Sequence, residues 1–171
     1  MATLRQTCDA LDHVLRLPPS SARGHAQRLR SAGYLPAAQG YPGQISSEHI
    51  AAILIAVAVG SPVVDGYLNL RPGAGGPALG KVLAGFVDKP FDLLEITIDT
   101  LAPGASVTFR GADHGVSTLA FYPSAPRPRP SFDREVRLGP EIFIRLHAAI
   151  AAAPEVRAGR PRLRDRYSRQ G

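Results

Sequence analysis

The sequence lacks tryptophan altogether, contains a single cysteine, Cys8, and has few aromatic residues. One cysteine cannot form an internal disulfide, which excludes a disulfide scaffold and fits a reducing compartment. The longest apolar run, residues 50–59, has about half the length that spans a bilayer. No basic segment followed by an apolar one opens the chain, so we expect no signal peptide and no membrane segment. We therefore expect a cytoplasmic protein.

The patterns that mark common enzymes are also missing. The five histidines and Cys8 show no metal-ligand spacing. The glycine-rich stretch 71–76 is not followed by Gly-Lys-Ser/Thr, so it does not predict a phosphate loop. Asp113 and His114 form an acid–histidine pair, but no nucleophile motif accompanies them. We expect no catalytic residues, no metal and no cofactor, and hence no enzyme.

Charge is distributed unevenly along the 171 residues. Residues 1–44 carry five Arg and two Asp, and residues 127–171 carry eleven Arg and five acids, whereas residues 45–126 have a net negative charge. Basic segments suit a polyanionic partner, because neutralised phosphates release their counterions. A GC-rich genome also produces arginine bias, so charge alone does not decide the function.

The N-terminal segment has the pattern of two helices separated by a tight turn. We predict a first helix over residues 3–16, with Thr3 and Gln6 forming a capping box. Pro18 and Pro19 end it. A second helix is predicted from about residue 19 to 32, and Gly33 suits its C-terminal end.

The second predicted helix has two distinct faces. Its apolar stripe of Ala22, Ala26 and Leu29 is built mainly from small residues and can lie close to a neighbour. Its polar side carries side chains of the types that bind guanine edges, adenine edges and phosphates. The predicted double-stranded DNA contacts are Ser20, Ser21, Arg23, Gln27, Arg28 and Arg30. Gly24 lies near this face, where a missing side chain lets the backbone approach a phosphate.

Residues 17–35, which read LPPSSARGHAQRLRSAGYL, resemble the recognition-helix segment of winged-helix regulators of the IclR and MarR types. The shared features are the leucine-proline-x-serine turn and the closing leucine-x-x-alanine-glycine. The resemblance implies that the serines and Arg23 contact bases or phosphates at the helix start, and that Gln27 and Arg30 follow along the groove. Only one helix precedes the turn, and residues 36–44 would make at most a short wing. The layout also resembles phage and prophage helix-turn-helix proteins, including small terminase subunits.

A third helix is predicted from Ser46 or Ser47 to Val59, with Ser46 as its cap and Ile45 and Ile50 as a hydrophobic staple. It is apolar on all sides and should be buried under the first two helices. We expect residues 1–60 to form a trihelical DNA-binding domain.

After the third helix, the spacing of apolar residues changes from helical to alternating. Residues 60–76 are predicted to be loop-rich, and a helix is predicted over 77–87. Alternating apolar and polar residues predict strands at 94–99, 106–110 and 117–122, with a possible fourth at 132–138. A last helix is predicted over 140–152. The expected fold class is α+β, with an antiparallel sheet and flanking helices over 77–153 as a dimerisation or sensing unit, a proline-rich loop at 123–130 and a basic, disordered tail at 154–171.

Three functional hypotheses follow. The first is a transcriptional regulator that binds double-stranded DNA as a homo-oligomer, with a dimer preferred. The second is a phage-type DNA-packaging or assembly protein that acts as a ring. The third is an interaction module, or an enzyme, that contains a trihelical fold but does not bind DNA.

Overall fold

The computed structural model describes residues 2–36, 45–73, 75–123 and 134–154. The predicted wing, proline-rich loop and basic tail lie largely outside these ranges. The elements in chain order are α1 (Leu4–Leu15), α2 (Ser21–Ser31), α3 (Ser47–Val59), the 3-10 turn η1 (Ser61–Val63), α4 (Val64–Leu68), β1 (Arg71–Pro72), α5 (Leu79–Asp88), the 3-10 turn η2 (Pro90–Asp92), β2 (Leu93–Asp99), β3 (Gly104–Arg110), β4 (Val116–Tyr122), β5 (Glu135–Leu138) and α6 (Pro140–Ala151). The α+β fold class is confirmed.

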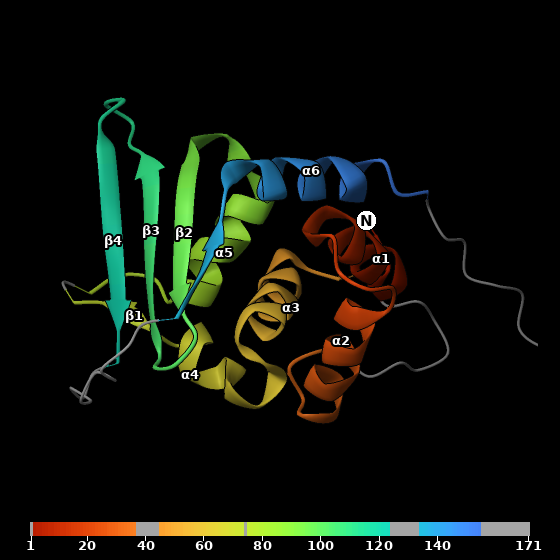
Figure 1. The fold of residues 1–171 in the computed structure, drawn as a ribbon. Coiled ribbons are helices and arrows are strands. Elements are labelled where there is room, and N and C mark those ends of the chain that lie inside the picture. Colours follow the sequence, from red (N-terminus) through yellow and green to blue (C-terminus); the bar gives the residue numbers. More distant parts are fainter. Residues whose placement is uncertain (1, 37–44, 74, 124–133, 155–171) are drawn as a thin grey trace, which may run out of the picture.

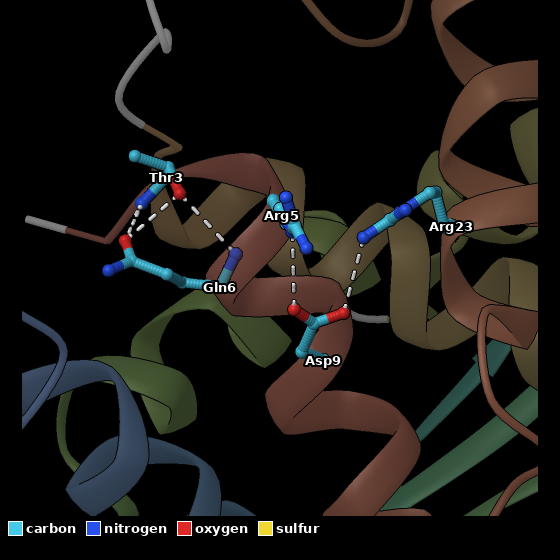
Figure 2. A network of polar contacts seen from close by, with 5 residues as sticks. All are labelled: Thr3, Arg5, Gln6, Asp9 and Arg23. Carbon is cyan, nitrogen blue, oxygen red and sulfur yellow. Dashed lines mark hydrogen bonds and ion pairs between the residues drawn. The ribbon is translucent and has the colours of Figure 1, made fainter. Parts of the chain in front are cut away.

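Capping boxes begin α1 and α3. The Thr3 backbone N–H donates to Gln6 Oε1 over 2.8 Å, and the Gln6 N–H donates to Thr3 Oγ1 over 3.3 Å (Figure 2). Ser46 and His49 form the equivalent pair at the start of α3. Each box satisfies backbone N–H groups that the first helical turn leaves without partners. Both starts agree with the sequence prediction.

Helix α2 begins about two residues later than predicted. Ser20, its N-cap, has φ +69°, in the left-handed region, so the helix cannot extend back through it to Pro19. At the other end Gly33 has φ +84°, a conformation that glycine adopts without a Cβ penalty. The left-handed Ser20 at one end and Gly33 at the other therefore limit α2 to eleven residues.

Residues 60–76, predicted to be loop-rich, also contain η1, the short helix α4 and the edge strand β1. Val64 and Tyr67, three residues apart, are both buried and hold the short helix α4 against the core. The Tyr67 hydroxyl donates to the Asp99 carbonyl at the end of β2 over 2.6 Å. Residues 71 and 72, at the start of the glycine-rich stretch 71–76, form an edge strand paired with β4.

The sheet has the order β1-β4-β3-β2-β5, and all of its pairs are antiparallel. The meander β2-β3-β4 and the fourth strand agree with the predicted alternation. The inner face is apolar, with Ile96 opposite Val107 and Ile98 opposite Ala105. The described helices gather on this side of the sheet (Figure 1). The outer face carries polar residues that include Thr97, Ser106, Thr108 and Thr118.

Helix α3 lies at the centre of the molecule (Figure 1). Its residues 50–56 are all buried, because it packs between α2 on one side and α5 on the other. Helix α6 crosses from the sheet to α1 and packs against it. The expected burial of α3 is thus confirmed, but α1 obtains much of its cover from α6. One hydrophobic core runs continuously from α1 to the sheet.

Among the described residues, no helix combines the length and hydropathy needed to cross a bilayer.

Candidate nucleic-acid interface

The turn between α1 and α2 is built from two left-handed residues and two prolines. Arg16, the C-cap of α1, has φ +54°, and Ser20 has φ +69°. The Leu17 backbone N–H donates to the Asp12 carbonyl over 2.8 Å and closes the end of α1. The Ser21 hydroxyl donates to the Pro18 carbonyl over 2.7 Å and ties the start of α2 to the turn. These bonds set the direction in which α2 leaves α1.

The buried stripe of α2 is the one predicted. Ala22 and Leu29 are 0% exposed and Ala26 is 1% exposed. They face α1 and α3, which are the packing partners of this helix. Two of the three side chains are methyl groups, so the α2 backbone lies close to its neighbours and its opposite side is left free.

The exposed side of α2 presents a basic and polar surface. Arg23, Gln27 and Arg28 are exposed, Arg30 is half-buried, and Ser20 is exposed at the N-terminal end. At 100° per residue, Arg23, Gln27 and Arg30 share an arc of about 60°. Arg28 lies about 100° from Gln27, with Gly24 between them, and Ser20 precedes the helix. Five of the six predicted residues therefore lie on the exposed side of α2 or at its start. We call Ser20, Arg23, Gln27, Arg28 and Arg30 the α2 face.

Several predicted contact residues have partners within the protein. Arg23 Nη2 lies 3.4 Å from Asp9 Oδ1 in an exposed ion pair, and Arg5 approaches the same carboxylate at 3.8 Å (Figure 2). Exposed pairs of this kind contribute at most about 1 kcal/mol, so a phosphate can compete for Arg23. Arg30 Nε donates to the Pro36 carbonyl over 3.1 Å. The Ser21 hydroxyl is engaged in the turn, which makes it a structural residue first.

Gln27 and Arg28 differ from these residues. Neither side chain forms a hydrogen bond or an ion pair with any residue in the part of the chain that the structure describes. Gly24 is exposed between them, and a Cβ built on it meets no atom within 4 Å. At the centre of the α2 face, a partner could therefore contact both the side chains of Gln27 and Arg28 and the backbone of Gly24.

Sequence reasoning missed Asp12. This residue is 8% exposed, and its Oδ1 accepts a 2.8 Å hydrogen bond from the Ala22 backbone N–H. It therefore satisfies the first turn of α2 in place of Ser20, whose side chain makes no capping bond. A signal was present: Asp12 follows Cys8 by four residues, and both lie on the buried side of α1.

His25 anchors the flank of α2. Its Nδ1 lies 2.9 Å from Ser61 Oγ in η1. Burial, and then the charge of Arg28, lower the pKa of His25 below its usual 6.5, so the imidazole is neutral at pH 7. His25 therefore adds a hydrogen bond to the scaffold and no charge to the α2 face.

The acid–histidine pair Asp113 and His114 forms part of a turn. Asp113 Oδ1 accepts from the Gly115 N–H over 3.1 Å, and His114 is exposed with φ +60° between β3 and β4. Over the described ranges, no three His, Cys, Asp or Glu residues gather as a metal site would require.

Comparisons of the chain with known protein families, with curated proteins and with solved structures find no match.

Proposed function

We propose that the protein binds double-stranded DNA by placing α2 in the major groove and that it acts as a transcriptional regulator. The observation that supports this proposal is the α2 face, where Gln27 and Arg28 are exposed and form no side-chain bond with any described residue, while the opposite stripe is buried. An α-helix with its side chains is about 10–12 Å across, which suits a groove of about 12 Å width.

The chemistry of the α2 face matches the two kinds of contact that a DNA reader makes. Gln27 carries an amide that bonds bidentately to adenine, and arginine does the same with guanine. Ser20, at the exposed helix start, and Arg23 lie where phosphate contacts fix the position of a protein on the duplex. Gly24 gives the DNA backbone room to approach.

The test is DNA binding by variants that leave the fold intact. Duplexes are selected from a random pool, and binding is followed by fluorescence anisotropy at about 50 and 200 mM salt. Gln27→Ala is expected to weaken binding to the selected site by about tenfold and to relax its sequence preference. Arg28→Ala is expected to weaken binding to all sequences and to reduce the salt slope by about 0.9.

Arg110→Ala is the matched control. Arg110 is exposed at the end of β3, in the sheet rather than in the helical half of the molecule, and its replacement removes the same charge (Figure 1). It should leave the affinity unchanged. Absence of binding to any duplex at low salt would reject the proposal. Binding that survives the Gln27→Ala, Arg28→Ala double change would move the interface away from α2.

We propose further that the protein reads DNA as a homodimer. The edge of β4 supports this, because β1 pairs only with Phe121 and Tyr122, and the described strands leave residues 116–120 unpaired on that side. Such an edge pairs readily with a second copy. Light scattering after size exclusion is expected to give twice the chain mass. A monomer would reject the dimer, and a larger ring would favour the DNA-packaging hypothesis over regulation.

A further inference from the structure

A second candidate site lies away from the α2 face. A cavity of about 480 Å³ opens where the end of α1, the second half of α3, β5 and the start of α6 meet. In Figure 1, α6 crosses here from β5 toward α1. The volume falls within the range of about 300–1,000 Å³ that is typical of small-molecule sites.

The walls of this cavity are somewhat more apolar than polar. They are formed by side chains from all four elements, including Leu15, Leu54, Val57, Val136, Leu138 and Ile142. Leu54 and Leu138 are buried, and the other four are half-buried. A hydrocarbon group in this cavity would have its apolar surface removed from water on several sides. This burial is the main source of binding energy for an apolar ligand.

Two arginines in the same cavity have no partner among the residues that the structure describes. Arg16, at the end of α1, and Arg145, in α6, both line it. Neither guanidinium forms a hydrogen bond or an ion pair with another residue of the described ranges. Arg137 also lines the cavity, but it is paired with Glu135 at 3.5 Å. The cavity therefore combines an apolar interior with two available cationic donors.

One acidic residue, Glu141, lines the cavity and must be accounted for. Its carboxylate lies against Gly139, the N-cap of α6, where it faces the positive end of the helix. Arg145 is four residues further along the same helix, yet the two side chains are not within ion-pair distance. Glu141 thus leaves Arg145 free and reduces, without cancelling, the positive charge of the cavity.

From this combination we infer that the cavity binds a small amphipathic carboxylate, with its hydrocarbon part between α3 and α6 and its carboxylate on Arg16 and Arg145. Guanidinium groups bind carboxylates through charge-assisted hydrogen bonds. Neither half of the ligand suffices, because the tail has no charge to offer and a bare anion has no apolar surface to bury. The site is independent of DNA binding.

Isothermal titration calorimetry of the full chain tests this inference with octanoate, 1-octanol and inorganic phosphate as probes. Octanoate is expected to bind one-to-one with a Kd on the order of 100 µM, which is reasonable for about ten heavy atoms. 1-Octanol and phosphate should each bind at least about tenfold more weakly. In NMR spectra of the protein, the largest changes in backbone amide chemical shift on octanoate binding should be those of Val57, Ala58 and Ile142, which line the cavity.

Variants of the two arginines test whether they bind the carboxylate of the ligand. Arg16→Gln and Arg145→Gln should each weaken octanoate by about tenfold and leave 1-octanol unchanged. Both side chains are exposed and make no hydrogen bond in the described structure, so circular dichroism should be unaltered. Glu141→Gln should tighten octanoate binding by a few-fold, because it removes a like charge. Arg110→Gln is the control and should change nothing.

Three results would overturn the inference. The first is no octanoate binding up to about 5 mM, far above the expected Kd. The second is equal affinity for octanoate and 1-octanol. The third is octanoate affinity that is the same in the Arg16→Gln, Arg145→Gln double variant as in the original chain.

Discussion

The Asp12 carboxylate, near the end of α1, accepts a 2.8 Å hydrogen bond from the Ala22 backbone N–H in the first turn of α2. Both residues are buried, so this bond connects the two helices at the point where the chain reverses. It supplies the anion that a helix N-terminus favours, from outside the helix itself. The presentation of the α2 face therefore depends on a residue in α1.

Replacement of Asp12 should destabilise the protein. Asp12→Ala leaves the buried Ala22 N–H without a partner, and we expect the free energy of unfolding to fall by about 1–3 kcal/mol. Asp12→Asn keeps an acceptor oxygen and should lower the free energy of unfolding by less. Urea unfolding followed by circular dichroism measures both. Asp9→Ala, which removes only exposed ion pairs, is the control and should cost less than about 1 kcal/mol; equal losses at the two positions would contradict the capping role.

Gly24→Ala separates folding from DNA binding. Gly24 lies in α2 with no atom within 4 Å of the added methyl group, so helix propensity should raise the free energy of unfolding by about 0.5–1 kcal/mol. The same change at Gly85, exposed in α5 with equal space, should stabilise equally. If α2 lies in the groove, Gly24→Ala weakens DNA binding and Gly85→Ala does not. Equal affinities in the anisotropy assay would argue against a close backbone approach at Gly24.

Neighbouring serines should respond to glycine with opposite signs. Ser20 has φ +69°, which costs a residue with a side chain about 1–2 kcal/mol, so Ser20→Gly should increase thermal stability. Ser21 is helical, and its hydroxyl bonds to the Pro18 carbonyl. Ser21→Gly loses that bond and about 0.5 kcal/mol of helix propensity, so it should lower the Tm. Scanning calorimetry of the two variants compares them directly, and shifts of the same sign would disagree with the left-handed turn.

Cys8 should be chemically inert while the protein is folded. It is 0% exposed, and burial, followed by the charge of Asp12, raises the pKa of its thiol from 9.0 to about 11. Because the thiolate is the reactive form, a disulfide reagent at pH 8 should label native protein at the rate of unfolding and urea-unfolded protein at once. Rapid labelling of the native chain would contradict this burial.

The same pKa shift makes stability depend on alkaline pH. The folded-state pKa lies above the unfolded value, so the stabilisation from the protonated thiol is complete below about pH 9 and is lost as the pH rises toward 11. Tyr67, whose pKa burial raises to about 12, adds a similar loss above pH 10. Urea unfolding between pH 8 and 10 isolates the cysteine. In that interval Cys8→Ala should show a flatter decline, and an unchanged decline would assign the effect to another group.

Features governed by residues close in the chain were predictable. The capping box of Thr3 with Gln6 and the capping of the third helix by Ser46 depend on groups three residues apart. Helical and alternating periodicities located the long helices and the meander because one face of each must be buried. The apolar stripe of α2, and hence the existence of its exposed face, followed from the same reasoning.

Features that join distant residues were decided only by the tertiary structure. Nothing in the five residues of α4, or in the pairing of Arg71 with Tyr122, stands out until the chain has packed. The spacing of Asp12 from Cys8 indicates its burial, but only packing supplies its partner Ala22 in α2. Packing alone likewise forms the cavity that brings Arg16 and Arg145 together from opposite ends of the described chain. The physical reason is that periodicity shows which side of an element is apolar, whereas the identity of its neighbour depends on how all the elements pack around one shared core.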